Sequence, residues 1–459
     1  MKLEKYKNIY FVGIGGIGMS ALARWFNNKA YNIAGYDRSN SEITSSLQNQ
    51  GVNIHFDDDV DLIPKSFKNP NSCIVIYTPA IPKTHSELLW FRTNNFKIFK
   101  RAEILGVIAR DYECIAVAGT HGKTSVSTLI AYIFNKSFDS ANAFLGGISV
   151  NYNSNLIYAP KSEKLVIEAD EFDRSFLHLS PKTAVVTHID ADHLDIYGSY
   201  NELLKTFKQF ASNIPNNGTL FCNIELIEHF KNLNNIKLYS YTSDNPKSDF
   251  YAKIVNISDK GTKFDLVTPS GIISNIILPQ VGSHHLENAV VAIAIAQSYG
   301  ISENEIKNTL VNYKGVRRRY ELITKTENIT FIDDYAHHPK ELSVTINALR
   351  TQFPGKYITG IFQPHLFSRT RDLADEFAIE LSKLDELILL EIYPARELPI
   401  QGIDSNYLIQ KVKLKNKQLL TKSDLLQYIE TKLKCGILVT LGAGDIDRLV
   451  KPISKILLK

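Results

Sequence analysis

The sequence predicts an α/β protein of three domains, each built around a largely parallel sheet, and three observations lead to this prediction. Short apolar runs alternate with helical patterns along the chain, which is typical of parallel strands joined by crossover helices. Two glycine-rich segments, Gly13–Gly18 and Gly119–Gly122, each follow an apolar run and precede a helical pattern. The length of 459 residues is about three times that of an ordinary domain.

The first expected domain covers residues 1–106 and is Rossmann-like. An apolar run at Ile9–Val12 leads into the first glycine-rich segment, and a helical stretch follows at Ala21–Asn28. Further short strands are expected at Asn32–Tyr36 and Cys73–Tyr77. This alternation indicates an open parallel sheet, which binds its ligands beyond the carboxyl ends of the strands.

The second expected domain covers residues 107–314 and contains a P-loop ATPase-type sheet. Its first strand, Cys114–Ala118, leads into a Gly-Lys-Thr segment and a helix at Val126–Phe134. Alternating polar and apolar residues over positions 250–280 indicate an antiparallel excursion with turns at Gly261 and Gly271. Further elements are expected at Lys164–Ile167, Thr183–Thr187 and Glu287–Tyr299, the last one capped by Gly300.

The third expected domain covers residues 315–459 and is again Rossmann-like with a parallel sheet. Strands that alternate with helical stretches are expected at Thr330–Asp333, Tyr357–Phe362, Glu386–Leu390 and Ile437–Thr440. The repeated alternation predicts the same layered arrangement as in the first domain.

The composition indicates a globular cytoplasmic protein and argues against several functional classes. The formal net charge is only +4, so no strongly basic surface for nucleic acid or for a membrane is expected. The cysteines are scattered without a CxxC pair, as for free thiols in a reducing compartment. The N-terminus lacks the apolar segment of a signal peptide, and no apolar stretch of about 18 residues predicts a transmembrane helix.

The segment Ala118–Ser125, with the sequence AGTHGKTS, predicts a phosphate loop at the start of a helix. Its glycines let backbone N–H groups converge on phosphate oxygens, and the helix N-terminus adds partial positive charge. Lys123 is expected to reach the β- and γ-phosphates of ATP, and the Thr124 hydroxyl to bind Mg²⁺. The general motif has glycine where this chain has Val117, so the prediction depends on the strand–loop–helix context.

Acidic residues follow two expected strands of the second domain. One cluster, EADEFD, runs from Glu168 to Asp173, and the other, DADHLD, runs from Asp190 to Asp195. Carboxylates near nucleotide phosphates repel one another unless cations lie among them, and Mg²⁺ prefers such oxygen ligands. A histidine within the second cluster, His193, could complete one metal shell. The sequence therefore predicts Mg²⁺ beside the ATP phosphates.

Gly13–Gly18 satisfies the pattern G-x-G-x-x-G, and Asp37 follows at the end of the next strand. This arrangement predicts a nucleoside diphosphate at the helix N-terminus, with Asp37 on a ribose hydroxyl. An NAD-linked oxidoreductase would use such a site, but it has no need for a separate ATP loop. A UDP-linked substrate presents the same pyrophosphate and ribose, and it fits the whole chain better.

Longer motifs occur in the order GIGGIGMS, AGTHGKTS, EADEFDRSFLHLSP, DADHLDIYG, GVRRRYE, DDYAHHPKE and FQPHLFSRTRD. Together they resemble the Mur ligases of peptidoglycan synthesis over nearly the whole chain. The last two motifs are most similar to the member of that family that adds L-alanine. The resemblance implies a UDP-substrate domain, an ATP domain and a mobile C-terminal domain that binds the amino acid.

The resemblance implies ATP-dependent ligation of L-alanine to UDP-N-acetylmuramate, the first step of the stem peptide. The muramate carboxylate attacks the γ-phosphate to give an acyl phosphate, which the amine of L-alanine then attacks. Catalysis is expected to depend on positioning and on cations around the developing negative charge. The implied cofactors are ATP and Mg²⁺, and the implied partners are the two small-molecule substrates, without nucleic acid or membrane insertion. A cytoplasmic monomer or weak homodimer that serves cell-wall biogenesis, cell shape and cell division is expected.

The resemblance also assigns roles to individual residues. Catalytic roles fall on Lys123, Glu168, His193, His337, Arg369 and Arg371, and metal ligation on Thr124, Glu168 and His193. ATP contacts fall on Gly119, Thr120, His121, Gly122, Lys123, Thr124, Ser125, Asn288, Arg319 and Asp334. Substrate contacts fall on Gly13, Gly15, Gly16, Gly18, Met19, Ser20, Asp37, Thr78, Ala80, Tyr335 and His338. The guanidinium of Arg371, or of a neighbouring arginine, suits the alanine carboxylate.

One position departs from the family pattern. Mur ligases usually carry His-Asn-x-x-Asn before the helix on the adenine side, whereas this chain has His284 and His285 followed by Leu-Glu-Asn288. Imidazole can donate or accept one hydrogen bond, so adenine binding with an altered geometry is expected at His285.

Three alternative functions differ in what they require. Another Mur-type ligase, such as one that recycles murein tripeptides, shares the ATP domain and differs in residues 335–371 and in the N-terminal loop. An NAD-linked oxidoreductase would use Gly13–Gly18 alone. A nucleotide-gated binding protein without chemistry would be expected to lack Lys123 or Glu168, and both are present.

Overall fold

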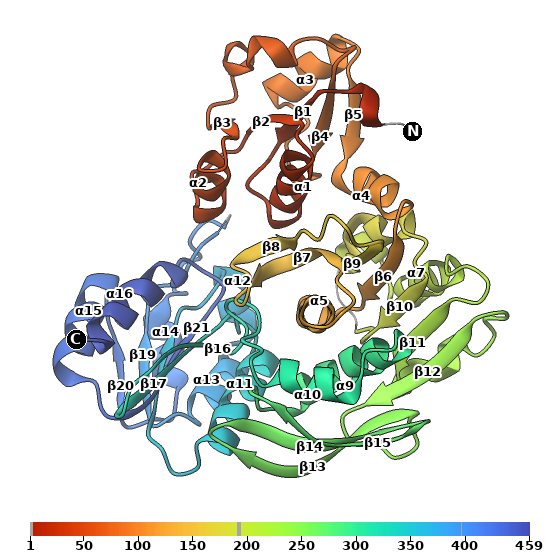
Figure 1. Ribbon diagram of the computed structural model, residues 1–459. Coiled ribbons are helices and arrows are strands. Elements are labelled where there is room, and N and C mark those ends of the chain that lie inside the picture. The colour runs from red at the N-terminus through yellow and green to blue at the C-terminus, as the bar shows by residue number, and fades with distance from the viewer. Residues whose placement is uncertain (1–2, 191–193, 396) are drawn as a thin grey trace. The chain divides into compact units, whose positions relative to one another are not determined.

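The computed structural model describes residues 3–190, 194–395 and 397–459 (Figure 1). The strands form sheets of five, ten and six members, which confirms the predicted α/β class with three sheet-containing regions. The chain divides into two compact units, the first of which comprises Met1–Lys253, Leu266–Ser274 and Glu287–Leu310. The second comprises Ile254–Asp265, Asn275–Leu286 and Val311–Lys459. Among the described helices, none combines the length and the apolar character needed to cross a membrane.

The five-stranded sheet of the first unit has the order β3-β2-β1-β4-β5 and is parallel throughout. Successive side chains of its central strand point to opposite faces, so Ile9 and Phe11 join one hydrophobic cluster and Tyr10 and Val12 join another. The strands are β1 (Asn8–Val12), β2 (Asn32–Tyr36), β3 (Asn53–His55), β4 (Cys73–Tyr77) and β5 (Lys97–Lys100). The helices are α1 (Ile17–Asn28), α2 (Glu42–Gln48), α3 (Ser86–Thr93) and α4 (Arg101–Ala109).

The ten-stranded sheet has the order β15-β14-β13-β12-β11-β10-β6-β9-β7-β8. It is mixed, because β7 and β8 pair antiparallel whereas β6, β9, β10 and β11 run parallel. The strands are β6 (Glu113–Ala118), β7 (Asn142–Ser149), β8 (Ser154–Ile157), β9 (Lys164–Glu168), β10 (Thr183–Val186), β11 (Thr219–Asn223), β12 (Lys237–Thr242), β13 (Phe250–Ser258), β14 (Gly261–Thr268) and β15 (Gly271–Leu278). The helices are α5 (Lys123–Lys136), α6 (Leu194–Tyr197), α7 (Tyr200–Ser212), α8 (Ile227–Phe230), α9 (Ser283–Ser298) and α10 (Glu303–Leu310).

The six-stranded sheet of the second unit has the order β16-β17-β21-β18-β19-β20. Its strands are parallel as expected except β16, which pairs antiparallel with β17 because the connection between them is too short for a crossover. The strands are β16 (Glu321–Lys325), β17 (Ile329–Asp334), β18 (Ile358–Phe362), β19 (Glu386–Leu389), β20 (Lys417–Leu419) and β21 (Gly436–Leu441). The helices are α11 (Pro339–Gln352), α12 (Phe367–Asp372), α13 (Ala374–Leu381), α14 (Ser405–Lys411), α15 (Lys422–Lys432) and α16 (Asp447–Leu457).

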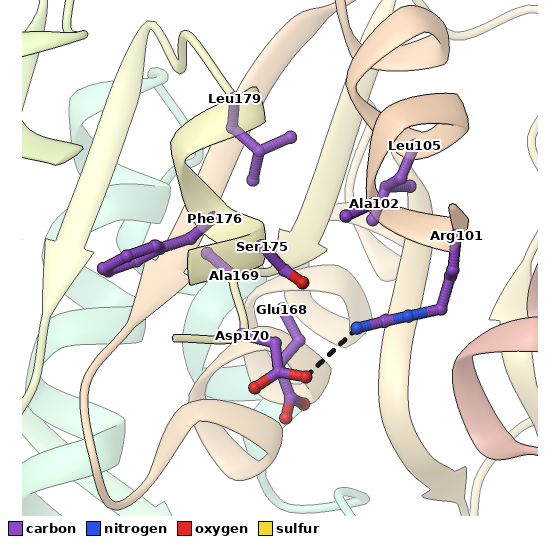
Figure 2. Close-up of a pocket in the computed structure, with 9 residues that line it drawn as sticks. All are labelled: Arg101, Ala102, Leu105, Glu168, Ala169, Asp170, Ser175, Phe176 and Leu179. Atoms are coloured by element: carbon purple, nitrogen blue, oxygen red, sulfur yellow. Dashed lines mark hydrogen bonds and ion pairs between the residues drawn. The ribbon is translucent and has the colours of Figure 1, made fainter. Parts of the chain in front are cut away.

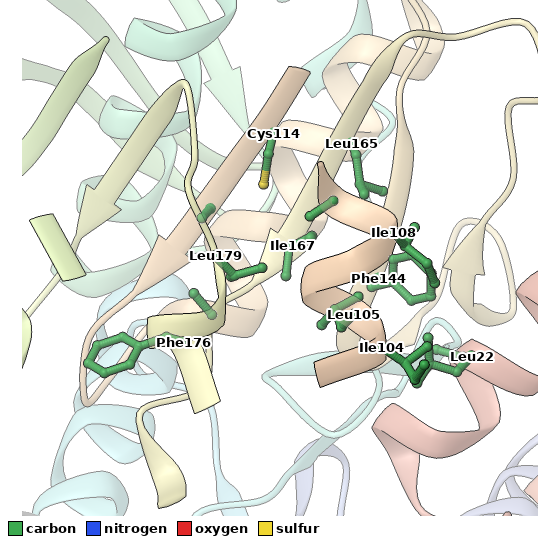
Figure 3. Packing of buried hydrophobic residues seen from close by; sticks show 14 of the residues in the cluster. Leu22, Ile104, Leu105, Ile108, Cys114, Phe144, Leu165, Ile167, Phe176 and Leu179 are labelled. Atoms are coloured by element: carbon green, nitrogen blue, oxygen red, sulfur yellow. The ribbon is translucent and has the colours of Figure 1, made fainter. Parts of the chain in front are cut away.

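Within the first unit, one hydrophobic cluster joins the five-stranded sheet to the part of the ten-stranded sheet that contains β6, β7 and β9 (Figure 3). Leu22 of α1 and Ile104 of α4 pack in the same cluster as Phe144 of β7 and Ile167 of β9. Burying several such side chains contributes roughly 1.5–3 kcal/mol each. The cluster therefore fixes the carboxyl ends of the strands in the five-stranded sheet relative to those of β6 and β9, where the candidate site lies.

Candidate active site

The phosphate loop lies where β6 ends and α5 begins, as the sequence predicts. Gly122 precedes the helix with a φ of 80°, and Gly119 has a φ of 133°, both of which favour glycine. A Cβ atom on Gly119 would also collide with the Thr187 hydroxyl. The Thr120 amide donates to the His188 carbonyl at 2.8 Å, so the end of β10 holds the loop in place. The loop is thus fixed at a helix N-terminus, where backbone N–H groups bind anions.

Lys123 is the first residue of α5, and its ammonium group has two oxygen partners. Nζ donates to the Gly119 carbonyl at 2.6 Å and forms an ion pair with Glu171 at 2.7 Å. The side chain of Glu171 is 1% exposed and that of Lys123 is 14% exposed. A positive charge at a helix N-terminus is disfavoured unless an anion compensates it. Glu171 provides that compensation, and a phosphate bound in the loop can take its place.

Glu168 ends β9, and the backbone of β7 holds its carboxylate. Oε2 accepts a hydrogen bond from the Gly146 amide at 2.9 Å, and a Cβ atom on Gly146 would collide with both carboxylate oxygens. Burial raises the pKa of Glu168, while the Lys123 charge and the Thr124 hydroxyl partly oppose that shift. Hydroxyl and carboxylate oxygens are ligands that Mg²⁺ prefers, so Thr124 and Glu168 fit the predicted metal.

The other acids of the first cluster pair with basic side chains of the protein. The pairs are Asp170 with Arg101 at 3.1 Å, Glu171 with Lys123 at 2.7 Å and Asp173 with Lys100 at 2.8 Å. From the sequence, Mg²⁺ is expected to relieve the repulsion among the carboxylates of this cluster. In the structure, lysine and arginine side chains provide much of that relief, and they come from segments distant in the sequence.

The second acid cluster is described only at its start. Asp190 lies 3.0 Å from Nε2 of His121 in the phosphate loop, so this acid is close to the loop as expected. His193 lies outside the described residues, and its metal role stays a prediction. Within the described ranges, no three His, Cys, Asp or Glu side chains come together as a metal-binding group.

Asn288 of α9 lies directly against the phosphate loop, since a Cβ atom on Gly122 would lie 2.8 Å from its side-chain oxygen. The neighbouring Glu287 accepts a hydrogen bond from Asn223 at 2.9 Å and pairs with His188 at 3.3 Å. Burial raises the pKa of Glu287, and His188 opposes this shift. The sequence prediction included Asn288 but missed the other three residues, although His188 and Asn223 stand at the ends of β10 and β11.

The N-terminal glycine loop joins β1 to α1 and is closely packed. Gly13 has a φ of 87°, and a Cβ atom there would lie 2.6 Å from the Thr78 methyl group. The Gly15 amide donates to Oδ2 of Asp37 at 2.7 Å. Asp37 therefore shapes the loop through its side chain, and its expected contact with a ribose stays a prediction.

Two residues predicted to bind substrate turn their side chains inward. Met19 and Ser20 are 1% and 0% exposed. The Asn155 side-chain amide donates to Ser20 Oγ at 2.9 Å and to the Ile17 carbonyl at 2.5 Å, which ties β8 to the first turn of α1. These two side chains therefore serve packing, and the exposed Gly16 marks the accessible side of the loop.

In the second unit, Asp334 ends β17 and organises the backbone around it. Its carboxylate accepts hydrogen bonds from the Tyr320 amide at 2.7 Å and the Ala336 amide at 2.8 Å. Asp334 was predicted to reach the nucleotide, but its oxygens are engaged in these structural bonds. Arg319 is exposed, and its guanidinium carbon lies 5.3 Å from the centre of the Tyr335 ring. The contacts of Asp334 and Arg319 with the nucleotide stay predictions.

His337 and Arg369 belong to a cluster that also contains His365, which the sequence prediction missed. The rings of His337 and His365 meet edge to face with centroids 5.8 Å apart, and Arg369 Nη1 lies 3.4 Å from His365 Nδ1. Burial lowers the pKa of His365 to about 4. Arg371 instead is exposed and pairs with Asp372 at 2.7 Å. Of the two predicted arginines, Arg369 is the one that lies with the histidines.

Two other histidines singled out in the sequence have local structural partners. His338 caps α11, where its Nδ1 accepts a hydrogen bond from the Lys340 amide at 3.3 Å. His285 packs against His284 with ring centroids 3.9 Å apart and against Tyr320 at 5.6 Å. Burial lowers the pKa of each of these histidines, that of His284 to about 4. Their contacts with substrate and adenine stay predictions.

A pocket between α4 and the end of β9 lies beside the acid cluster (Figure 2). Its polar end is formed by Arg101, Glu168 and Asp170, and Figure 2 shows Arg101 and Asp170 pointing toward one another. The remaining lining residues are Ala102, Leu105, Ala169, Ser175, Phe176 and Leu179. Sequence reasoning missed Arg101, although it directly follows a strand of the first sheet, where ligand-binding residues are expected.

Comparisons with known proteins agree with the motif order. Family models match the chain for the Mur ligase family catalytic domain over residues 8–113, the Mur ligase middle domain over 117–296 and the Mur ligase glutamate ligase domain over 318–444. The chain is 45% identical to the UDP-N-acetylmuramate–L-alanine ligase of Porphyromonas gingivalis, over 98% of this chain and 99% of that protein. It is 44% identical to the ligase of the same name from Christiangramia forsetii, over 99% of both chains.

Solved structures of similar proteins share the fold. The UDP-N-acetylmuramate–alanine ligase of Thermotoga maritima superposes with a TM-score of 0.81 at 25% identity, covering 98% of this chain and 99% of that one. A murein peptide ligase from Psychrobacter arcticus has a TM-score of 0.68 at 22% identity over the same shares of the two chains, which is a likeness of fold. The motif order, the family models and the full-length relatives agree, and the chain belongs to the Mur ligase family.

Proposed function

We propose that the chain is an ATP-dependent ligase that joins L-alanine to UDP-N-acetylmuramate through an acyl phosphate. The observation that carries the proposal is that both phosphate loops of the first unit border one acid cluster. Lys123 of the second loop pairs with Glu171, and Arg101 beside the first loop pairs with Asp170. A substrate held by the first loop can thus present a carboxylate to ATP in the second. Full-length similarity to ligases named for L-alanine supports the choice of amino acid.

The second loop binds the β- and γ-phosphates of ATP through the N–H groups at the start of α5. Lys123 exchanges its ion pair with Glu171 for γ-phosphate oxygens, so its charge is compensated before and after ATP binds. Thr124 and Glu168 would hold Mg²⁺, and the ion would supply charge neutralisation of the phosphate oxygens that eases attack by an anionic nucleophile. Gly146 keeps the Glu168 carboxylate in place through its backbone amide.

The muramate carboxylate attacks the γ-phosphorus, and ADP leaves. This step converts a poor acyl donor into an acyl phosphate with phosphate as its leaving group. The amine of L-alanine then attacks the carbonyl carbon, and the tetrahedral intermediate expels phosphate to leave the amide. Lys123 stabilises the transferring phosphoryl group, and the protein contributes mainly by positioning and electrostatics.

The cluster of His337, His365 and Arg369 receives L-alanine. Arg369 binds the carboxylate, since a guanidinium matches its geometry. Burial lowers the pKa of both histidines, so they are uncharged at neutral pH. His337 Nδ1 lies 3.0 Å from the Tyr335 carbonyl and donates to it, so Nε2 is available to accept a hydrogen bond from the alanine amine.

The domains cover residues 1–106, 107–314 and 315–459, and bind the UDP-substrate, ATP and L-alanine respectively. The enzyme acts in the cytoplasm as a monomer or weak homodimer, because its substrates are soluble small molecules. Its product enters the stem peptide of peptidoglycan, and so supports cell shape and division.

The test is phosphate release by the full-length protein with ATP, Mg²⁺, UDP-N-acetylmuramate and one amino acid at a time. Turnover with L-alanine is expected, and mass spectrometry should detect UDP-N-acetylmuramoyl-L-alanine. Phosphate release with glycine and with L-serine shows how the enzyme distinguishes amino acids of similar size. Phosphate release with a murein tripeptide tests the alternative of a recycling ligase. Turnover with the tripeptide and none with L-alanine would contradict the proposal.

A further inference from the structure

We infer that Arg101 binds the diphosphate of the UDP-linked substrate and that Asp170 positions its guanidinium. The inference rests on the proposed function, because it adds a contact for the same substrate. Arg101 lies outside both glycine-rich motifs, at the start of α4 directly after β5.

The guanidinium of Arg101 lies against the first turn of α1. A Cβ atom on Gly18 would lie 2.5 Å from Nη1 and 2.9 Å from Cδ of Arg101. Only glycine therefore allows the arginine to approach the helix N-terminus this closely. The N–H groups of this turn are where the motif places a diphosphate, so the guanidinium and the backbone donors border the same space.

Asp170 holds the guanidinium in that place. Its Oδ2 accepts a hydrogen bond from Arg101 Nη2 at 3.1 Å, and its Oδ1 accepts one from the Phe172 amide at 3.0 Å. Both carboxylate oxygens of Asp170 are thus anchored by hydrogen bonds. Because Asp170 contacts only Nη2 of Arg101, Nε and Nη1 can donate hydrogen bonds to another anion. A donor that is already oriented loses less conformational entropy when the ligand binds.

The charge balance of the first loop requires such a residue. The segment Gly13–Ser20 contains neither lysine nor arginine, yet a diphosphate brings negative charge that backbone N–H groups compensate only in part. Arginine suits phosphate oxygens because its planar donors bind them in pairs. Arg101 supplies to this loop the cation that Lys123 supplies to the other.

Lys100 offers a matched control. It is adjacent to Arg101 and pairs with Asp173 of the same acid cluster at 2.8 Å. The side chain of Lys100 is 42% exposed and that of Asp173 is 40% exposed. Replacement of Lys100 removes one positive charge and one ion pair from the same place in the chain. It leaves the contact between Arg101 and Gly18 intact.

The experiment is isothermal titration of the full-length protein, without ATP, with UDP-N-acetylmuramate and separately with UDP. Arg101→Ala is expected to raise the Kd of both ligands by at least about tenfold, as for loss of a charged hydrogen bond. Arg101→Lys should fall between this variant and the wild type, because it keeps the charge and loses the paired donors. Lys100→Ala should stay within about twofold of the wild type, since the interaction it removes is exposed.

The outcomes separate this inference from the proposed function. An unchanged Kd for UDP in Arg101→Ala overturns the inference. A loss confined to UDP-N-acetylmuramate also overturns it, since the contact then lies on the muramate carboxylate. ATP binding by each variant shows whether it is folded. If Arg101→Ala does not bind ATP, Asp170→Asn replaces it in the test. Weaker binding of UDP by Asp170→Asn is then expected, and unchanged binding of UDP overturns the inference. A wild-type protein that binds neither UDP ligand counts against the proposed function instead.

Discussion

The loop Gly119–Ser125 carries its own cation, because Lys123 begins the helix that follows, whereas the loop Gly13–Ser20 contains no lysine or arginine. In the first loop, the nearby guanidinium belongs to Arg101, which the fold brings in from another strand. Both cations are held by acids of the same cluster, Asp170 and Glu171. In the proposed function, the first phosphate site takes its cation from a segment outside its glycine motif, so the motif alone does not contain every residue of the site.

Lys123→Ala should have the largest effect in the loop that carries its own cation. Loss of this charge removes stabilisation of the transferring phosphoryl group, so kcat should fall by roughly 10³-fold or more. Phosphate release with ATP, UDP-N-acetylmuramate and L-alanine measures it. Lys136→Ala, at the other end of α5, is the control and should retain turnover. Substantial activity in Lys123→Ala would rule out the role assigned to this loop.

Gly146→Ala should act through Glu168. The added methyl group collides with both carboxylate oxygens, so Glu168 must move away from its place beside Thr124. We expect kcat to fall by about 100-fold, the scale for disturbing a metal ligand's support, and the Mg²⁺ concentration for half-maximal rate to rise. Titration of the rate with Mg²⁺ measures both. An unchanged Mg²⁺ dependence would show that the Gly146 amide is unimportant for this ligand.

Two glycines of the first loop allow a matched comparison of smaller effects. A Cβ atom on Gly15 would lie 2.8 Å from Oδ2 of Asp37, whereas the nearest atom to one on Gly16 lies at 3.6 Å, an ordinary contact. Gly15→Ala should therefore weaken binding of UDP-N-acetylmuramate by about tenfold, and Gly16→Ala should weaken it less. Titration calorimetry measures both variants, and ATP binding should not change. Equal losses in the two variants would contradict the packing argument.

Glu87→Gln should leave turnover unchanged and alter the pH dependence of stability. Glu87 is fully buried and, unlike Glu171, has no lysine partner. The Tyr10 hydroxyl donates a hydrogen bond to its carboxylate at 2.7 Å, and burial raises the pKa of Glu87 to about 8. The folded state thus holds the proton more tightly than the unfolded state, whose value is near 4.5. The free energy of unfolding should fall as the pH rises between these values, by up to about 5 kcal/mol.

Urea denaturation at about pH 5 and about pH 8 tests this expectation, since the two conditions bracket most of the titration. The glutamine variant should lack this part of the slope, because its side chain does not titrate. The same slope in both proteins would mean that Glu87 is ionised in the folded state.

The fold and the positions of the two glycine-rich loops could be predicted because the apolar runs and glycine positions are local signals, while the binding of phosphate at these loops stays a prediction. The strand Cys73–Tyr77 has the expected bounds, and the strand ending at Glu168 is one residue longer than expected. Partners distant in the sequence could not be predicted, so the ion pairs of Arg101 and Lys123 were missed. The parallel sheet expected for the third region is confirmed for the predicted strands, and the additional strand β16 pairs antiparallel with β17 because the connection between them is short.

The direction in which individual side chains point could not be predicted from the sequence either. Arg369 and Arg371 lie on one short helix, but only Arg369 turns to the histidines, and a motif does not say which face a helix presents. Met19 and Ser20 belong to a binding motif, yet their side chains are buried. Asp334 accepts hydrogen bonds from backbone amides, which its motif did not indicate, and its expected contact with the nucleotide stays a prediction. Each of these outcomes depends on packing between segments that the sequence pattern does not relate.

The ion pair between Arg101 and Asp170 also bears on inhibitor design. Together with the hydrogen bonds of Asn155 to α1, it ties the surroundings of the two loops into one compact unit. If both loops bind phosphate groups as proposed, a single molecule that carries a nucleoside diphosphate and a second phosphate mimic can engage both loops without first bringing them together. With a spacer that matches their separation, the second group binds at a high effective concentration, and the affinity exceeds that of either fragment alone.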